Sequence, residues 1–457
     1  MKGFRVFLCL LLALLLPMSA MAEELILFCH SYNSETNSAF LQAYSDVTVR
    51  LSSDGGQESD FDQVLMDMVS RNFVYDLFKL PFSSGEARRL GDRGYLTDLN
   101  RSEILRETVA QMPEGIRQRV TNAKGEVFAL PFELAPTQSL MAFNTEIGEA
   151  LGIEKPRTWA ELLQLLDNWT YDYADEADKE GYRLIDSAYV LQPERILERM
   201  IDAYISVYAD GRLISFSTPE FTALMRSFES CRQSLADLGD LPLMEGSNLW
   251  QRTLIITNYP LLADYDTADM YQGVFEPMAL SVTDNPDEAV IAVDMEALSI
   301  SAGAPHAELA MTYAETLAAS MDDLNRILLQ GGSDDTPVEW AHYASQKQDY
   351  LDWIAEAEQA IEDGDEESES LTELIEAWRE ELEVFETRRY EYTSERIRQY
   401  AALAPCLRPM PAISYQYYIN QQNTLHLLSS FSNGSMAADQ FIREFDHVQS
   451  MMNLEDQ

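Results

Sequence analysis

An aromatic ring and a carboxylate end one of the most apolar stretches of the chain. GEVFALPFEL, residues 125–134, finishes in Pro131, Phe132 and Glu133. Proline cannot donate to a sheet ladder, and a carboxylate next to an apolar strand is costly to bury without a partner. We therefore expect Glu133 to bind a hydroxyl or an amine of a ligand. Phe132 either lines the same site or packs in the core.

The sequence lacks the motifs of common hydrolytic active sites. It contains no G-x-S-x-G and no H-E-x-x-H, and its five histidines are scattered. The acidic run EDGDEESES has Gly364 at its third position, whereas a calcium loop needs glycine at its sixth position. We predict no catalytic residue, no metal site and no cofactor. Acidic residues are too abundant to exclude a carbohydrate hydrolase with two carboxylates, which stays open as the alternative.

The net charge of the chain limits the classes of molecule that it is expected to bind. There are 77 acidic and 32 basic residues, which gives a formal charge of −45. Long-range repulsion then disfavours nucleic acid and anionic lipid. This composition is typical of a solvated exported protein, with attraction for cationic ligands as the second interpretation.

The first residues have the pattern of an export signal. MKGFRVFLCLLLALLLPMSAMA has two basic residues, a short apolar core and a small-residue ending, so we expect cleavage after Ala22. Cys9 lies inside the apolar core, which argues against a lipid anchor. We predict an exported protein, periplasmic or extracellular, while retention of the signal as an anchor stays open. Cys29, Cys231 and Cys406 remain, and pairing of the last two is undecided.

Strand and helix patterns alternate after the signal. ELILFC and DVTVRL read as strands, DFDQVLMDMVSRNF as a helix and VYDLFKL as a further strand, which predicts a parallel sheet flanked by helices. In such sheets ligands lie beyond the carboxyl ends of strands, so His30, Ser31 and Tyr32 are candidate ligand contacts. The alternative for His30 is to cap the following helix.

The segment from residue 340 to 400 has a helical pattern throughout, unlike the alternating strand and helix patterns before it. Apolar residues recur every three or four positions in each half, and the acidic run lies between the halves. This spacing predicts an antiparallel helical hairpin with a coiled-coil seam. Before this segment, ALSISAGAPHAELAMTYAETLAASMDDLNRILLQ predicts a strand, a turn and one long helix.

The order of these stretches resembles an extracellular solute-binding protein of ABC importers, in the branch similar to maltose-binding protein. The resemblance rests on LILFCHSYN, VYDLFKL, GEVFALPFELAPTQSLMAFNTE with its TWAEL helix, TLIITNYPLLADYD and ALSISAGAPHAELA. It implies an α/β chain of two discontinuous lobes with the type 2 periplasmic-binding fold and an inserted helical hairpin. The strands that cross between the lobes would fall near Phe132 and Met295.

The resemblance also implies boundaries and site residues. The expected segments are the signal at 1–22, lobe 1 at 23–131 and 294–340, lobe 2 at 132–293 and 404–457, and the hairpin at 341–403. The implied ligand contacts beyond those named above are Tyr189, Tyr259, Asp264, Met295, Tyr415 and Tyr417.

The function implied is a monomeric, non-catalytic receptor. It would capture a small solute, an oligosaccharide first among the candidates, and deliver it to an ABC permease in the membrane. Leu261 follows Pro260 where similar sugar binders carry an aromatic, and Cys29 stands where many carry tryptophan, which weakens maltodextrin as the ligand. Besides the hydrolase, a sensor that docks a partner through the acidic hairpin is the remaining hypothesis.

Overall fold

The structure is a computed structural model. It describes residues 23–29, 34–52, 58–81, 86–209, 214–239, 249–262, 274–331, 335–340, 342–363, 368–387, 389–410 and 421–455. The expected export signal, residues 1–22, lies outside the described residues. Within the described part, no helix is both long enough and apolar enough to cross a membrane.

The chain forms two compact units. Unit 1 contains Met1–Met112, Arg117–Glu133 and Met295–Asp322, and unit 2 contains Pro113–Ile116, Leu134–Asp294 and Asp323–Gln457. The chain changes unit after Glu133 and after Asp294, within two strands, and again after Asp322. Both units are therefore discontinuous in sequence.

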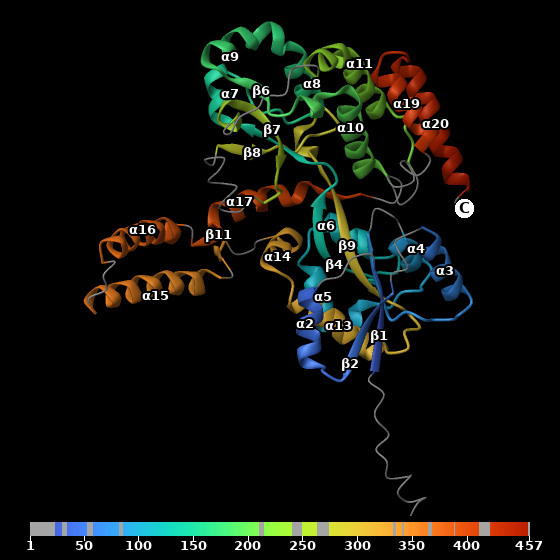
Figure 1. The fold of residues 1–457 in the computed structure, drawn as a ribbon. Coiled ribbons are helices and arrows are strands. Elements are labelled where there is room, and N and C mark those ends of the chain that lie inside the picture. Colours follow the sequence, from blue (N-terminus) through green and yellow to red (C-terminus); the bar gives the residue numbers. More distant parts are fainter. Residues whose placement is uncertain are drawn as a thin grey trace, which may run out of the picture. The chain divides into compact units, whose positions relative to one another are not determined.

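Unit 1 is built on a mostly parallel sheet (Figure 1). Strand β1 (Glu23–Cys29) pairs in parallel with β2 (Val47–Ser52) and with β3 (Leu77–Pro81). The second part of β9 (Ile291–Ile300) runs antiparallel to β3, and β4 (Leu130–Pro136) pairs with β9. The helices are α2 (Ser34–Ala43), α3 (Glu58–Val69), α4 (Glu86–Asp92), η2 (Leu99–Arg101), α5 (Glu103–Ala110), most of α6 (Glu114–Val120) and α13 (Ala307–Ala319).

A buried carboxylate joins the sheet of unit 1 to the loop before α13. Asp76 is fully buried, and its Oδ2 accepts a hydrogen bond from the backbone N–H of Ile26 at 2.9 Å. Its Oδ1 accepts from the backbone N–H of His306 at 2.8 Å. Because a buried carboxylate is stable only with partners, these bonds fix the start of β3 against both segments.

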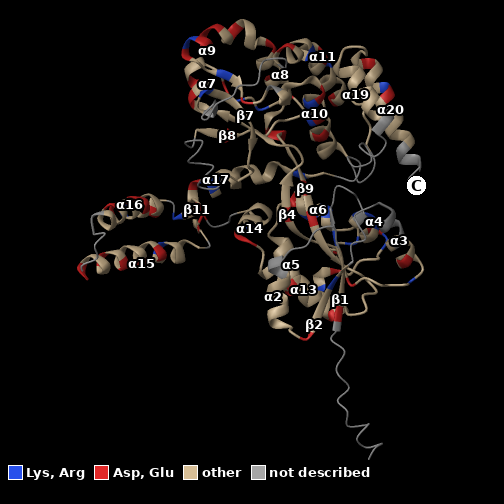
Figure 2. Ribbon diagram, in the orientation of Figure 1, with Lys and Arg blue, Asp and Glu red and all other residues tan. Residues whose placement is uncertain are grey.

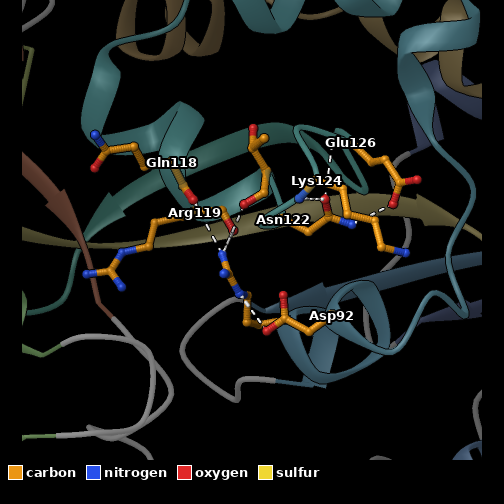
Figure 3. A network of polar contacts seen from close by, with 8 residues as sticks. Asp92, Gln118, Arg119, Asn122, Lys124 and Glu126 are labelled. Carbon is orange, nitrogen blue, oxygen red and sulfur yellow. Dashed lines mark hydrogen bonds and ion pairs between the residues drawn. The ribbon is translucent and has the colours of Figure 1, made fainter.

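Polar contacts fix the approach to β4 (Figure 3). Arg88 on α4 forms an ion pair with Asp92 at 2.9 Å and donates to the Thr121 carbonyl at 3.2 Å, just past the end of α6. Asn122 accepts from the backbone N–H of Glu126 at 3.1 Å, which closes a turn in which Gly125 has a φ of 81°. Positive φ is a conformation that glycine adopts without strain.

Strand β4 begins later than the sequence pattern predicts. The pattern favours a strand from residue 125, whereas β4 starts at Leu130, because residues 121–127 form the turn closed by a bridge between Thr121 and Val127. Among the described strands, β4 pairs only with β9. Its two prolines, Pro131 and Pro136, are tolerated because an edge strand can lack a donor on its free side.

Unit 2 has a four-stranded sheet in the order β6 (Arg183–Ile185), β7 (Thr253–Tyr259), β5 (Leu140–Asn144) and β8 (Phe275–Pro277). The first part of β9 pairs with β12 (Leu407–Pro409). The helices before the hairpin are α7 (Thr145–Leu151), α8 (Trp159–Asn168), η3 (Trp169–Tyr173), α9 (Ala174–Glu180), η4 (Ala188–Leu191), α10 (Pro193–Tyr208), α11 (Pro219–Gly239), η5 (Leu249–Arg252), η6 (Pro286–Glu288) and α14 (Asp323–Gln330).

Aromatic residues form much of the core of unit 2. Phe216 lies 4.6 Å from Phe445 between ring centroids, and Phe431 stacks on Phe441 at 4.4 Å. The last two rings belong to α19 (Gln421–Ser432) and α20 (Ala438–Glu455), which pack on each other in Figure 1. Phe441 and Phe445 are fully buried, so one face of α20 belongs to this core.

The helix predicted after β9 is two helices. Helix α13 ends at Ala319 and α14 begins at Asp323, so the prediction of one long helix is wrong. The interruption coincides with the change of unit after Asp322. Hydrophobic periodicity continues through the interruption, and tertiary structure decides where the helix ends.

The predicted helical hairpin is present. Helices α15 (Tyr343–Glu362) and α16 (Ser368–Thr387) enclose a small apolar cluster of Ile354, Ala357 and Ile375. Strands β10 (Val338–Glu339) and β11 (Tyr390–Tyr392) pair at its base. Figure 2 shows acidic residues along both hairpin helices. The segment expected as hairpin, 341–403, also contains α17 (Ser394–Leu403), which contributes to the body of unit 2 as described below; η7 (Ala404–Cys406) follows it.

Candidate functional site

The structure distributes the predicted site residues over both units. Phe132, Glu133 and Met295 belong to unit 1, and Tyr189 and Tyr259 belong to unit 2. The others lie outside the described residues: His30, Ser31, Tyr32, Asp264, Tyr415 and Tyr417. Each unit is therefore considered by itself.

In unit 1 a buried lysine connects three strands. Lys79 on β3 has a side chain only 10% exposed, and its Nζ lies 2.8 Å from a carboxylate oxygen of Glu296 on β9. The same Nζ lies 4.9 Å from the centre of the Phe132 ring on β4, a cation–π contact. Phe132 is buried, so it packs in the core, which was one of its two expected roles. Its ring holds the lysine in place.

Glu133 follows this cluster directly and is exposed. Partial burial raises the pKa of its carboxyl group, the neighbouring Glu296 raises it further, and Lys79 opposes both. The side chain is thus a solvent-accessible acceptor in a locally acidic setting. Such an oxygen can accept a hydrogen bond from a hydroxyl, as the ligand prediction requires.

Met295 is 1% exposed and lies where β9 enters unit 1. Its side chain is core in the structure. A role in ligand contact remains only a prediction from the resemblance.

In unit 2 the exposed aromatic is Tyr189, in the short helix η4 before α10. Its side chain is 50% exposed, and Arg195 lies over its ring at 5.1 Å from the centroid. Arg195 also donates to the Tyr189 hydroxyl at 2.5 Å and to Glu198 at 3.1 Å. A ring held in this way keeps its orientation and still offers apolar surface to solvent. Flat aromatic faces of this kind stack on the C–H surfaces of sugars.

Charged residues continue along the same helix, one turn apart. Arg199 donates to the carbonyl of Ser139 at 2.5 Å. Asp202, 3% exposed, accepts a long hydrogen bond of 3.4 Å from the Gln138 side chain. We call Arg195, Glu198, Arg199 and Asp202 the α10 ladder. It runs from the exposed Tyr189 into the interior of unit 2.

Burial shifts the titration of the α10 ladder. Desolvation raises the pKa of Asp202 to about 7, and the Gln138 hydrogen bond and Arg199 only partly oppose this shift. Desolvation also raises the pKa of Glu198 and lowers that of Arg199. Groups shifted by burial near a surface aromatic are characteristic of ligand sites, although structural networks show them too.

Tyr259, at the end of β7, is engaged inside unit 2. It is 4% exposed and packs against Ala142, Ile256 and Phe275. Arg396 on α17 donates to its hydroxyl at 3.2 Å. The tyrosine therefore anchors α17 to the sheet, and its predicted ligand contact remains a prediction.

At the end of the adjacent strand β6, Asp186 accepts from the Thr257 hydroxyl at 2.9 Å and fixes the same sheet edge.

The α10 ladder was not identified from the sequence. Its signal was available: Arg195 and Arg199 are four positions apart, as are Glu198 and Asp202, so the four residues share one side of the helix. Periodicity showed that the segment is a helix. It did not show that the charged face turns inward, because that requires the position of β5.

Cys231 and Cys406 are free, and the buried Cys231 thiol donates to the Leu163 carbonyl at 3.3 Å. Among the described residues, no group of three or more histidine, cysteine, aspartate or glutamate side chains could hold a metal ion.

No protein-family model and no curated protein matches the sequence. Solved structures do match. The binding protein MsmE of Bacillus subtilis, in an open conformation, superposes with a TM-score of 0.57 at 12% identity, covering 96% of this chain and 99% of that one. The chain has the fold of periplasmic binding proteins.

Two other structures of the same fold carry names that include a sugar. The galacto-N-biose/lacto-N-biose I-binding protein of an ABC transporter from Bifidobacterium longum, in complex with lacto-N-biose, has a TM-score of 0.52 at 11% identity. It covers 96% of this chain and 98% of its own. A sugar transporter from Rhizobium etli has a TM-score of 0.53 at 10% identity, with 94% and 99% covered. The predicted fold class, an α/β two-lobed binding-protein fold with discontinuous lobes, is confirmed.

Proposed function

We propose that this chain is the extracytoplasmic receptor of an ABC importer and that it captures an oligosaccharide. It binds without chemical turnover, acts as a monomer, closes its two lobes on the solute and delivers it to a membrane permease. The fold supports this proposal, since the solved proteins that share it include sugar-binding proteins. At identities of 10–12%, the choice of sugar has to be argued from the side chains of this chain and not from its structural neighbours.

The observation that carries the proposal is Tyr189. Its ring is half exposed and is fixed by the Arg195 guanidinium, which lies over it and also donates to Glu198. Stacking against a sugar ring and hydrogen bonding to its hydroxyls need this combination. In unit 1, Glu133 offers an exposed carboxylate for further hydroxyl contacts.

The test begins with a thermal-shift screen of neutral di- to tetrasaccharides, with polyamines and peptides as competing classes. A ligand that binds the folded state raises the melting temperature by mass action. Hits are then titrated by calorimetry against wild type and Tyr189→Ala. The proposal predicts saturable binding of at least one sugar that weakens in the variant. Binding only of polyamines or peptides, or turnover of the sugar, would contradict it.

A second function is favoured by the hairpin. Rings contact one another in a row along α15 and α16: Tyr350 lies 5.4 Å from Trp353, which lies 5.9 Å from Trp378. Trp353 is 45% exposed among sixteen acidic and two basic residues in 343–387. An exposed tryptophan, supported by two partly buried rings in an acidic surface, is suited to a basic protein partner. Docking of such a partner is compatible with solute capture, and deleting the hairpin separates the two roles.

A further inference from the structure

A cavity lies inside unit 2, at the inner end of the α10 ladder. Its volume is about 60 Å³, and residues of the β4–β5 connection, α10 and the first part of β9 line it. This volume is well above the roughly 10–15 Å³ that a single water molecule needs, so the pocket has room for more than one. We call it the Asp202 pocket.

Two buried polar atoms that line the Asp202 pocket lack a partner. Among the described residues, neither Oδ1 of Asp202 nor the indole Nε1 of Trp159 has a hydrogen bond. Both side chains are nearly inaccessible, at 3% and 4% exposure. One of these atoms is an acceptor and the other a donor, and buried polar groups of this kind are normally satisfied by protein, water or ligand.

The neighbouring protein groups are already engaged. Gln138 donates to the other oxygen of Asp202, and Arg199 donates to the Ser139 carbonyl. The Thr137 hydroxyl donates to the Ala292 carbonyl at 3.3 Å, which joins β9 to the β4–β5 connection. Apolar side chains form another part of the wall, with Met141, Met278 and Leu280 all at or below 5% exposure.

The charges around the cavity select the class of ligand. An anion could accept from the Trp159 indole but offers Asp202 Oδ1 no donor, and an ammonium group would lie beside the Arg199 guanidinium and offer the indole N–H no acceptor. A hydroxyl group both donates and accepts, and the C–H surface of a small alcohol suits the apolar wall.

We infer that the Asp202 pocket is a binding site for a small neutral hydroxyl compound, a polyol of about glycerol size, which accepts from the Trp159 indole and donates to Asp202. This site is separate from the Tyr189 surface. It adds a second ligand site to unit 2 and does not depend on which solute the receptor carries.

The test reads the indole resonances of the full chain. The protein is labelled with ¹⁵N-tryptophan, its six indoles are observed by NMR, and Trp159 is assigned through Trp159→Phe. Glycerol and 1,2-ethanediol are titrated to tens of millimolar, below the range in which polyols stabilise proteins by exclusion. Acetate and ammonium are titrated as the charged controls. The expected result is a saturable shift of the Trp159 indole with a polyol and no saturable shift with either ion.

Two variants test whether the shift arises from binding in the Asp202 pocket. Ala203 lines the cavity, so Ala203→Val fills it and should abolish the shift while the melting temperature stays near that of wild type. Asp202→Leu removes the acceptor at similar volume and should weaken binding at least tenfold. If Trp159→Phe does not fold, ¹³C-methyl methionine with Met278 assigned by Met278→Leu gives the same titration.

Three results would overturn the inference. A linear shift shared by all six indoles would be a bulk solvent effect, and saturation by acetate or ammonium would assign a charged ligand. Cross-relaxation of the Trp159 indole with water that no polyol alters would show that water alone occupies the cavity.

Discussion

Replacing Asp202 by asparagine should stabilise unit 2 in mild alkali and leave its stability almost unchanged in acid. The carboxyl group is 3% exposed, and desolvation raises its pKa from 3.8 to about 7 in the folded chain. The folded state therefore holds this proton more tightly than the unfolded state does. The stability that the protonated acid contributes is fully present below about pH 4 and is lost as the pH rises through 7.

The size of the effect follows from the shift. It spans about three pKa units, and each unit corresponds to about 1.4 kcal/mol, so the ionised carboxylate costs up to about 4 kcal/mol at pH 8. Asparagine has the same shape and no charge. We expect Asp202→Asn to gain about 2–4 kcal/mol over wild type at pH 8, about 1–2 kcal/mol at pH 5 and less than about 1 kcal/mol at pH 4.

Tryptophan fluorescence measures this unit selectively, because all six tryptophans belong to unit 2. Thermal and urea unfolding would be recorded at pH 5, 6, 7 and 8. Asp287→Asn is the matched control, since it removes one negative charge from a side chain that is 86% exposed. A difference between Asp202→Asn and wild type that stays constant from pH 5 to 8, or that equals the control, would refute the claim that this carboxylate is buried without sufficient compensation.

Three other perturbations follow from the structure. Glu296→Gln leaves the Lys79 ammonium, 10% exposed, without its carboxylate and should destabilise unit 1 by about 1–3 kcal/mol in circular dichroism melts; an unchanged melt would mean the pair is not formed. Tyr189→Ala should raise the Kd for the bound sugar at least tenfold, about 1.4 kcal/mol or more, with the melting temperature unchanged, and equal calorimetric affinity would exclude this ring from the site. Deleting 343–387 should leave that Kd within a factor of about two while abolishing any partner docking; lost sugar affinity would assign the hairpin to the solute site.

Local chemistry was sufficient to predict several elements. Thr158 and Glu161 form the reciprocal capping box that their spacing predicts, with hydrogen bonds in both directions. The seam residues of the hairpin, among them Ile354 and Ile375, meet in its small core. Such features depend on residues within one or two turns, which a sequence pattern contains completely.

Features that depend on tertiary structure were not predictable in the same way. The late start of β4 depends on the Asn122 turn, and the end of α13 at Ala319 coincides with a change of unit. Tyr259 was expected at a ligand surface because of its place in a loop pattern, whereas Arg396, 137 residues away, engages its hydroxyl. Nothing in either segment alone indicates that contact.

The candidate site shows the same division. Glu133 could be predicted as a ligand contact because a carboxylate beside a proline and an apolar strand is costly to bury. It is exposed in the structure. The inward orientation of Asp202 could not be selected, since it depends on Gln138 from a distant part of the chain. The aromatic clusters of unit 2 likewise combine helices from both ends of its sequence.

The central claim is that this chain captures a sugar by closing its two lobes. Small-angle X-ray scattering of the monomer, with and without a saturating oligosaccharide found by calorimetry, tests it most directly. The account predicts a smaller radius of gyration in the complex, with the sugar recovered intact. An unchanged radius with every sugar that binds, or recovery of cleaved sugar, would contradict it.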